Sequence, residues 1–474
     1  MAYQNNKRLL HRKEFQMMTP AVTATVAGSF IIKDPLGTRR TALHVFNTGS
    51  PALYDVNEDA FQILPSFALG GTFAAGACGS WGLWSNTLTA TGGTTTTITL
   101  TTNITGKLEG RTVWFQTGAS VTGLRRTITR VDIVPGGTNV ITLDSALPVA
   151  TPASSTFKID SGVYYVFNAY TALVAGVIRS YDLVTGTLTS LTTTGLPATW
   201  GTDGRLVGTP SYVGAFATGT ATAGGATTLT NSIKAWTTNQ WSNYQVSITA
   251  GTGIGQVRSI ASNTGTVLTV SAAWTTNPDA TSQYAIEGND DYLYLLGNGA
   301  VTMYRYSISA NTWTTLAPTA ARAAAPGTGM SGNWVSKTGD SFWSNENANI
   351  LDGRFIYSFR GAGTADLHRY DIALNTWATI SYQRPGETFT TGSCWDIDGP
   401  RIYGMKESTG RFFYYNVVDN EITGFTTDFY PQSTAVVGDK MFTVSYDDGA
   451  GGDVIDWVYY LGNTTTALRR IMIY

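Results

Sequence analysis

The sequence contains few charged residues for its length. Charged side chains make up 13% of the 474 residues, about half of the usual share, whereas 42% of the residues are hydrophobic and 12% are aromatic. This composition excludes an intrinsically disordered chain and an array of charged helices. The net charge of −2 supplies no basic field of the kind that dominates binding to duplex DNA, so we expect no direct sequence-specific nucleic-acid binding.

Cysteine and histidine are scarcer still. Cys78 and Cys394 lie far apart in the sequence without a metal-ligand motif, which excludes a disulfide framework and a zinc site and indicates two small buried hydrophobic residues. The three histidines, His11, His44 and His368, are dispersed along the chain. Because no titratable residues converge in the sequence, we expect no catalytic, cofactor-binding or metal site, and a protein that is not an enzyme.

Long apolar runs are missing as well. The N-terminal residues lack the roughly 7 to 15 apolar residues of a secretory signal, and the most apolar stretch, residues 67–84, consists mostly of small residues. We therefore expect a protein without a signal peptide or a membrane partner, made in the cytoplasm.

Glycine, with 52 residues, and threonine are abundant, which favours turns and strands over helices. The length exceeds the roughly 250 to 300 residues that one hydrophobic core serves, so repeated units are expected. Five segments share one pattern of aromatic, turn and aliphatic positions: residues 53–64, 180–191, 305–316, 369–380 and 414–425. Each predicts a β-hairpin in which a strand ending in a Tyr-Asp pair turns at Asn or Gly.

An aromatic-rich strand precedes each hairpin, and a sixth copy closes the chain at residues 456–474 without a return strand. We expect the N-terminal segment Val22 to Ile32 to supply this outer strand, because pairing the two chain ends would remove an exposed sheet edge.

Two Thr-rich segments, residues 85–160 and 216–288, interrupt the repeat and resemble each other, for example in Gly123 and Gly255. Without them the chain divides into six units near a blade period of roughly 50 residues. The sequence therefore predicts an all-β fold, a β-propeller of six kelch-like blades with two inserted small β modules; five or seven blades are alternatives, because the N-terminal unit is poorly marked. Its expected parts are an N-terminal arm and first blade (1–84), insert 1 (85–160), a blade (161–215), insert 2 (216–288) and the remaining blades (289–474), which close onto the N-terminal region.

Two resemblances add to this interpretation. The Tyr-Asp-x-x-x-Asn-Thr-Trp pattern of residues 291–380 resembles the kelch blade, although most units lack its Gly-Gly doublet. Residues 255–286 of insert 2 resemble a segment that recurs in virion structural proteins of tailed bacteriophages. The second resemblance implies a protein located in the virion, whose partners are other virion proteins and copies of itself in a symmetric ring.

Two groups of residues are candidates for such contacts. A segment this polar is more easily ordered by a neighbouring subunit than by its own core, so we expect partner contacts from the N-terminal arm residues Lys7, Arg8, Leu9, Leu10, Arg12, Lys13 and Phe15. Aromatic residues outside the repeat are candidates for exposed contacts, including contacts with a glycan: Trp81, Trp84, Trp236 and Trp241.

The leading functional hypothesis is a structural component of a tailed-phage virion, in a ring or collar of the tail or neck, that acts through protein–protein contacts. An alternative is a virion protein that binds a glycan receptor on the host surface. A glycan-degrading propeller enzyme is a third hypothesis, disfavoured because the sequence lacks a carboxylate constellation.

Overall fold

The computed structural model describes residues 77–323 and 354–380, each with short gaps, Asn420, and the strands outside these ranges whose bounds are given below. All regular structure in this part of the chain is β-strand. None of it forms a helix long and apolar enough to span a membrane.

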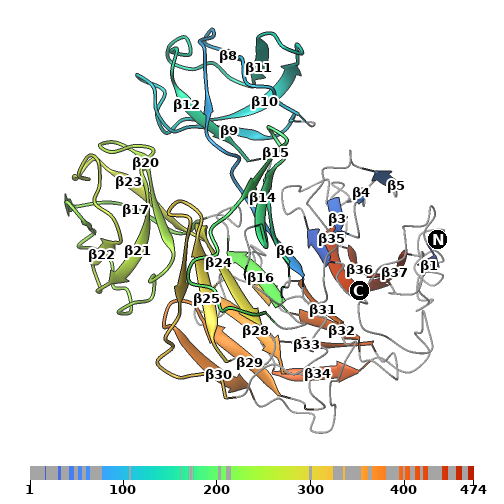
Figure 1. The fold of residues 1–474 in the computed structure, drawn as a ribbon. Coiled ribbons are helices and arrows are strands. Elements are labelled where there is room, and N and C mark those ends of the chain that lie inside the picture. Colours follow the sequence, from blue (N-terminus) through green and yellow to red (C-terminus); the bar gives the residue numbers. More distant parts are fainter. Residues whose placement is uncertain are drawn as a thin grey trace, which may run out of the picture.

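Six four-stranded antiparallel sheets form the blades of a propeller (Figure 1). Blade 1 contains β2 (Phe30–Lys33), β3 (Ala42–Phe46), β4 (Ala52–Asp55) and β5 (Ala60–Ile63). Blade 2 contains β6 (Cys78–Gly82), β13 (Val163–Phe167), β14 (Ile178–Asp182) and β15 (Thr187–Ser190). Blade 3 contains β16 (Gly204–Thr209), β24 (Asn289–Gly297), β25 (Met303–Ser307) and β26 (Thr312–Thr315).

Blade 4 contains β27 (Val335–Ser336), β28 (Phe355–Phe359), β29 (Leu367–Asp371) and β30 (Thr376–Ile380). Blade 5 contains β31 (Cys394–Asp398), β32 (Arg401–Met405), β33 (Phe412–Asn416) and β34 (Glu421–Gly424). Blade 6 contains β35 (Lys440–Tyr446), β36 (Ile455–Leu461), β37 (Leu468–Ile473) and β1 (Gln16–Met17). The first strands named for each blade contact one another in the order β2, β6, β16, β27, β31, β35 and again β2, so the six blades close into a ring.

The two ends of the chain meet in blade 6. Gln16 of β1 pairs with Arg470 of β37, and Met17 pairs with Arg469, so an N-terminal strand completes the C-terminal blade. The prediction that Val22 to Ile32 supplies this strand was wrong. The end of this segment belongs to β2, the innermost strand of blade 1, where Phe30 pairs with Phe46. Because blade 1 needs this apolar strand for itself, the closing strand comes from earlier in the chain.

Ring closure predicts the effect of a C-terminal truncation. Deleting residues 465–474 removes β37, and thereby leaves β36 and β1 without their shared neighbour. We expect loss of the cooperative thermal transition of the whole propeller, because both sheet edges become unpaired at once. Calorimetry of the truncated protein measures this, and a transition at the parent temperature would contradict it.

The repeated hairpins share one register. The repeat tyrosine always faces the large apolar residue of the return strand: Tyr306 faces Trp313, Tyr370 faces Trp377, Tyr54 faces Phe61, Tyr181 faces Leu188 and Tyr415 faces Ile422. The hairpins predicted from these segments are therefore confirmed. The tryptophans at these positions are core residues, since Trp313 is 7% and Trp377 5% exposed.

A single hydrogen bond explains why the repeat requires both Tyr and Asn. The hydroxyl group of Tyr370 donates to Oδ1 of Asn375 at 2.7 Å, and Tyr306 does the same to Asn311 at 2.7 Å. Both asparagines have φ of 50°, a left-handed conformation that Asn tolerates better than most residues. The buried phenol thus fixes the turn while satisfying its own polar atom.

The two inserts are separate sheets that share the order of six strands, and insert 2 has a seventh strand at one edge. Insert 1 has the order β7-β12-β9-β10-β11-β8, and insert 2 has the order β17-β23-β20-β21-β22-β19-β18. The strands of insert 1 are β7 (Leu88–Thr89), β8 (Thr97–Leu100), β9 (Thr112–Phe115), β10 (Arg125–Asp132), β11 (Asn139–Leu143) and β12 (Thr156–Ile159). Those of insert 2 are β17 (Ala215–Thr220), β18 (Ala223–Gly225), β19 (Thr228–Thr230), β20 (Gln245–Ala250), β21 (Val257–Asn263), β22 (Val267–Val270) and β23 (Gln283–Glu287).

The likeness of the inserts extends to their irregularities. The register between β10 and β11 shifts directly after Ile128, and the register between β21 and β22 shifts directly after the corresponding Ile260. Each insert also has its own buried cluster of apolar residues. The similarity seen in the sequence therefore reflects one fold used twice.

Blade 4 contains a buried polar cluster. Nε of Arg322 donates to Nδ1 of His368 at 2.7 Å, and its Nη2 donates to Oγ of Ser358 at 2.9 Å. All three residues are buried. An accepting Nδ1 belongs to a neutral imidazole, and burial together with the charge of Arg322 lowers the pKa of His368 to about 4.

This cluster predicts a loss of stability in mild acid. The folded state keeps His368 neutral, whereas the unfolded chain takes up a proton below its ordinary pKa of about 6.5. The contribution of neutral His368 to the free energy of unfolding is therefore complete above pH 6.5, and it is lost progressively as the pH falls towards 4. We expect the melting temperature of His368→Gln, which keeps an acceptor for Arg322, to fall less between pH 7 and pH 5 than that of the parent; parallel profiles would contradict the assignment.

Candidate functional site

Each insert is seated on a hairpin turn of the propeller. Val184, from the β14–β15 turn of blade 2, is part of the buried cluster of insert 1. Ala373, from the β29–β30 turn of blade 4, is part of the buried cluster of insert 2. Val184 and Ala373 occupy the same position of the repeat, three residues after its tyrosine. The repeat therefore provides two equivalent docking positions on the propeller. At each of them a residue of the hairpin turn packs into the apolar core of the docked insert.

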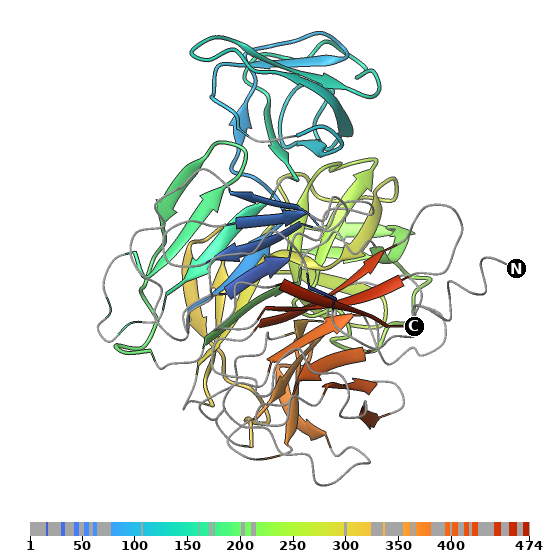
Figure 2. The ribbon, with the colours of Figure 1, turned by 90° about the vertical axis from the view of Figure 1, so that its right-hand side faces the viewer.

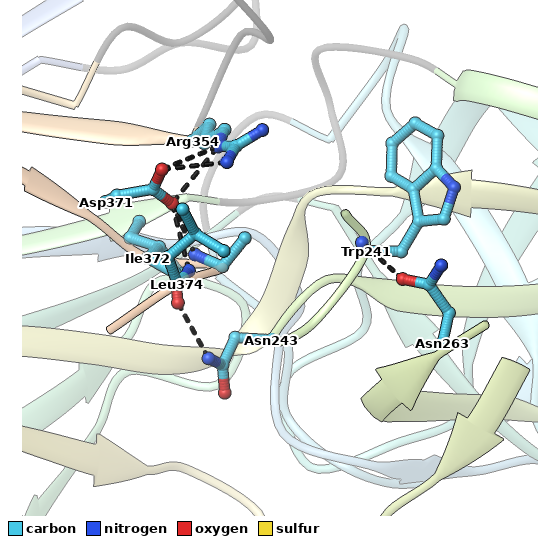
Figure 3. Close-up of polar contacts among 8 residues, drawn as sticks. Trp241, Asn243, Asn263, Arg354, Asp371, Ile372 and Leu374 are labelled. Carbon is cyan, nitrogen blue, oxygen red and sulfur yellow. Dashed lines mark hydrogen bonds and ion pairs between the residues drawn. The ribbon is translucent and has the colours of Figure 1, made fainter. Parts of the chain in front are cut away.

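Asp182 and Asp371 hold these two turns in shape. Oδ1 of Asp182 accepts from the backbone N–H of Val184 at 2.7 Å, and Oδ1 of Asp371 accepts from that of Ala373 at 3.0 Å. The guanidinium of Arg354 binds Asp371 with both prongs of its fork, at 2.8 to 3.0 Å (Figure 3). Such a bidentate pair fixes orientation more strongly than a single charge contact.

Asn243 attaches insert 2 to two blades at once. Its Nδ2 donates to the carbonyl oxygen of Ile372 in blade 4 at 2.7 Å (Figure 3). Its Oδ1 accepts from Nη1 of Arg305 in blade 3 at 2.6 Å. Its backbone has φ of 67°, so the loop before β20 is shaped to present this side chain. Insert 2 interrupts blade 3 between β16 and β24, and Asn243 fixes it to blade 4 as well.

Asp290 joins the propeller to both inserts. It lies on β24 of blade 3, and its Oδ2 accepts from Nε1 of Trp84, directly before insert 1, and from Nε2 of Gln245 in insert 2, both at 3.0 Å. Lys158 of β12 lies in the field of Asp290 and Asp291; burial lowers the pKa of its ammonium group, and these carboxylates partly oppose that shift. Both inserts thus share one polar anchor.

The inserts also touch each other, at equivalent residues. A Cβ atom added to Gly123 would lie 2.7 Å from Cα of Gly255, and one added to Gly255 would lie 2.7 Å from the backbone nitrogen of Gly123. This reciprocity is typical of a two-fold contact between identical surfaces. Both glycines are left-handed, with φ of 82° and 84°. Backbone meets backbone here, so no other residue fits without displacing the partner.

A pocket of about 280 Å³ lies beside this glycine contact. Insert 1 contributes Trp114 and Arg125 to its wall, and insert 2 contributes Ser247, Val257 and Glu287. Oγ of Ser247 donates to Oε2 of Glu287 at 3.2 Å. Burial raises the pKa of the Glu287 carboxyl group, against the opposing effect of the Arg125 charge. The pocket is therefore a polar site that exists only because the two inserts face each other.

The aromatic residues predicted as exposed contacts are mostly covered. Trp241 is 3% exposed and belongs to the core of insert 2, so the prediction was wrong for this residue; its ring packs edge-on against Tyr244. Trp84 is half-buried, with its ring 4.9 Å from that of Trp114. Trp236 is half-buried beside Tyr284. The side chain of Trp81 on β6 lies outside the described residues.

The N-terminal arm candidates also lie outside the described residues: Lys7, Arg8, Leu9, Leu10, Arg12, Lys13 and Phe15. Their contact with a partner stays a prediction. Cys78 is 4% exposed, as expected for a small buried hydrophobic residue, and the side chain of Cys394 is likewise outside the described part.

Sequence reasoning missed the residues that join the inserts to the propeller. Asn243 and Asp290 belong to no recognised motif, and their partners are 129 and 206 residues away in the chain. One signal was available: Gly123 and Gly255 correspond in the two inserts, and a glycine at the same place in both modules can mark a close approach of two backbones.

Within the described residues no group of three or more His, Cys, Asp and Glu side chains is arranged to hold a metal ion. No family model matches the chain, and no curated protein matches it. Among solved structures, that of Sqt1 from Saccharomyces cerevisiae is similar over 96% of this chain and 98% of its own, with 10% sequence identity and a TM-score of 0.36.

The glycine contact predicts a large difference between two glycine substitutions. Gly136 and Gly255 both have positive φ, but a Cβ at Gly136 meets nothing within 4 Å, whereas one at Gly255 meets the backbone of Gly123. In both alanine variants the left-handed backbone conformation destabilises the fold by about 1 kcal/mol. We expect Gly255→Ala to lose about 1 to 3 kcal/mol more in calorimetric unfolding, because a buried contact is forced apart; equal losses in the two variants would contradict the contact.

Proposed function

We propose that the protein is a structural component of a tailed-phage virion, in a ring or collar of the tail or neck, where it acts through contacts with other virion proteins and with copies of itself. The observation that carries this proposal is the resemblance of residues 255–286 to a recurring segment of phage virion structural proteins. In the structure this segment supplies β21, β22 and β23 of insert 2, three strands of one module with its own core.

The arrangement of the inserts supports a role in assembly. Figure 1 shows both inserts on the side of the propeller formed by blades 2 to 4, away from β1 and β37 of blade 6, and Figure 2 shows insert 1 standing out from the ring. Their outer loops carry apolar residues that the chain itself leaves exposed: Ile133 and Val134 are 46% and 48% exposed, and Ile233 is 84% exposed. Exposed apolar side chains on rigid, projecting modules suit contacts with neighbouring proteins.

The position of β1 supports the arm as a second contact. β1 is the outermost strand of blade 6, so the arm starts from the periphery of the ring. Leu9, Leu10 and Phe15 need an apolar groove, and the neighbouring cations make this stretch too polar to form a core of its own. A groove on an adjacent subunit meets both requirements.

The burial of the aromatic candidates argues against the glycan-receptor alternative. A sugar ring stacks on a free aromatic face. Trp241 offers none, and the ring of Trp84 is covered by Trp114 and by the guanidinium of Arg125. The enzyme alternative would need paired carboxylates in a cleft, and the pocket between the inserts contains one carboxyl group, that of Glu287.

The experiment deletes the arm while keeping the closing strand. Removing residues 2–13 leaves β1 intact, whereas removing residues 2–18 deletes it, so only the shorter deletion tests assembly alone. We expect the shorter variant to melt like the parent yet to be missing from purified particles, because Leu9, Leu10 and the four cations of the arm are gone. The longer variant should melt at a lower temperature. Particle composition is measured by quantitative mass spectrometry.

A matched variant separates the two functional hypotheses. Trp236→Ala removes a half-buried candidate tryptophan whose side chain the structure describes, without touching the arm. A structural component predicts normal incorporation and normal adsorption to cells for this variant. Normal incorporation of the arm-deleted protein, together with lost adsorption of Trp236→Ala particles, would contradict the structural proposal and favour receptor binding.

A further inference from the structure

The pocket between the inserts contains a guanidinium group that has no hydrogen-bond partner among the described residues. Arg125 lies at the start of β10, and its side chain makes no hydrogen bond or ion pair with any described residue. It is held instead by two aromatic rings, with its Cζ 5.4 Å from the ring centroid of Trp84 and 5.0 Å from that of Trp114. These cation–π contacts fix the group while leaving its N–H donors available.

The surroundings of Arg125 differ from those of other arginines on the same strand. Arg130, on β10 as well, is exposed to solvent like Arg125, but it is ion-paired with Asp132 at 2.6 Å. Arg126 donates to two backbone carbonyl groups, those of Arg125 and Ala146. Arg125 alone of the three both lines the pocket and lacks such a partner among the described residues. A guanidinium group in this position can bind a carboxylate, which accepts two parallel N–H hydrogen bonds from it.

The opposite wall limits what else the pocket accepts. Ile254 and Val257 give it an apolar side suited to the methylene groups of an acidic side chain. Glu287 adds a carboxyl group, which would repel the double negative charge of a phosphate monoester more strongly than a carboxylate. Burial raises the pKa of the Glu287 carboxyl group, which lessens its repulsion of a ligand carboxylate.

We propose that the pocket between the two inserts binds the carboxylate of an acidic side chain from a partner protein, with Arg125 as the primary contact. The assignment of the ligand to a partner protein rests on the proposed function, whereas the carboxylate specificity rests on the pocket alone. The site belongs to neither insert by itself, so it forms only when both modules are docked at Gly123 and Gly255.

The test uses the full-length protein and glutarate as a probe of stated chemistry. Protein labelled with ¹⁵N at tryptophan is titrated with glutarate at constant ionic strength, and the indole signal of Trp114, identified from a Trp114→Phe sample, reports on the pocket. Glutaramide, the neutral diamide of the same length, and inorganic phosphate are the comparison ligands. We expect a saturable shift with glutarate and weaker responses to the other two.

Arg125→Gln should weaken glutarate binding at least about tenfold, as expected for loss of hydrogen bonds to a charged group. Arg130→Gln, on the same strand, should bind like the parent. Equal responses to glutarate and glutaramide, unchanged binding by Arg125→Gln, or tighter binding of phosphate would overturn the carboxylate site. Saturable, Arg125-dependent glutarate binding by a protein that is absent from particles would instead leave the pocket assigned and refute the virion role.

Discussion

Closure of the ring is the constraint on which the remaining structure depends. A blade has two exposed edges unless its neighbours and the chain ends cover them, and the two-residue strand β1 completes blade 6 by pairing with β37. The inserts respect the same constraint. Insert 1 leaves after β6 and returns at β13, and insert 2 leaves after β16 and returns at β24; in each case the two strands are antiparallel neighbours. Their ends are already close, so a long insertion there costs little and leaves the ring intact.

Docking of the inserts depends on the hairpin turns of the blades. In blades 2 and 4 the hairpin turn is capped by an Asp and presents an apolar residue two positions later, and these residues, Val184 and Ala373, are parts of the insert cores. Hydrogen bonds to Asp290 and from Asn243 then fix the direction of each module. Apolar burial supplies attraction without direction, whereas these polar contacts have strict geometry and define how the modules face each other.

The sequence predicts contacts that repeat and fails on contacts that occur once. The hairpins and the likeness of the inserts were predictable, because Tyr370 with Trp377, or Ile128 with Ile260, recur at fixed spacing. The closing strand was misplaced, because Gln16–Met17 is too short to show a strand pattern. Trp241 was misjudged, because position outside the repeat says nothing about burial inside an insert. Asn243 and Asp290 bind residues that are far away in the sequence, and no local sequence pattern predicts such contacts.

The pocket arises from differences between two otherwise equivalent modules. In insert 1 Arg125 pairs with Trp114, and at the corresponding place in insert 2 Val257 pairs with Ser247. Two copies with Trp and Arg would set two cations against each other across the glycine contact, and two copies with Ser and Val would leave these positions without a cation. One copy of each kind places a single guanidinium opposite an apolar and hydroxyl-bearing wall. The two like modules thus form a self-complementary glycine contact, and the residues that differ at its rim make the adjoining pocket asymmetric.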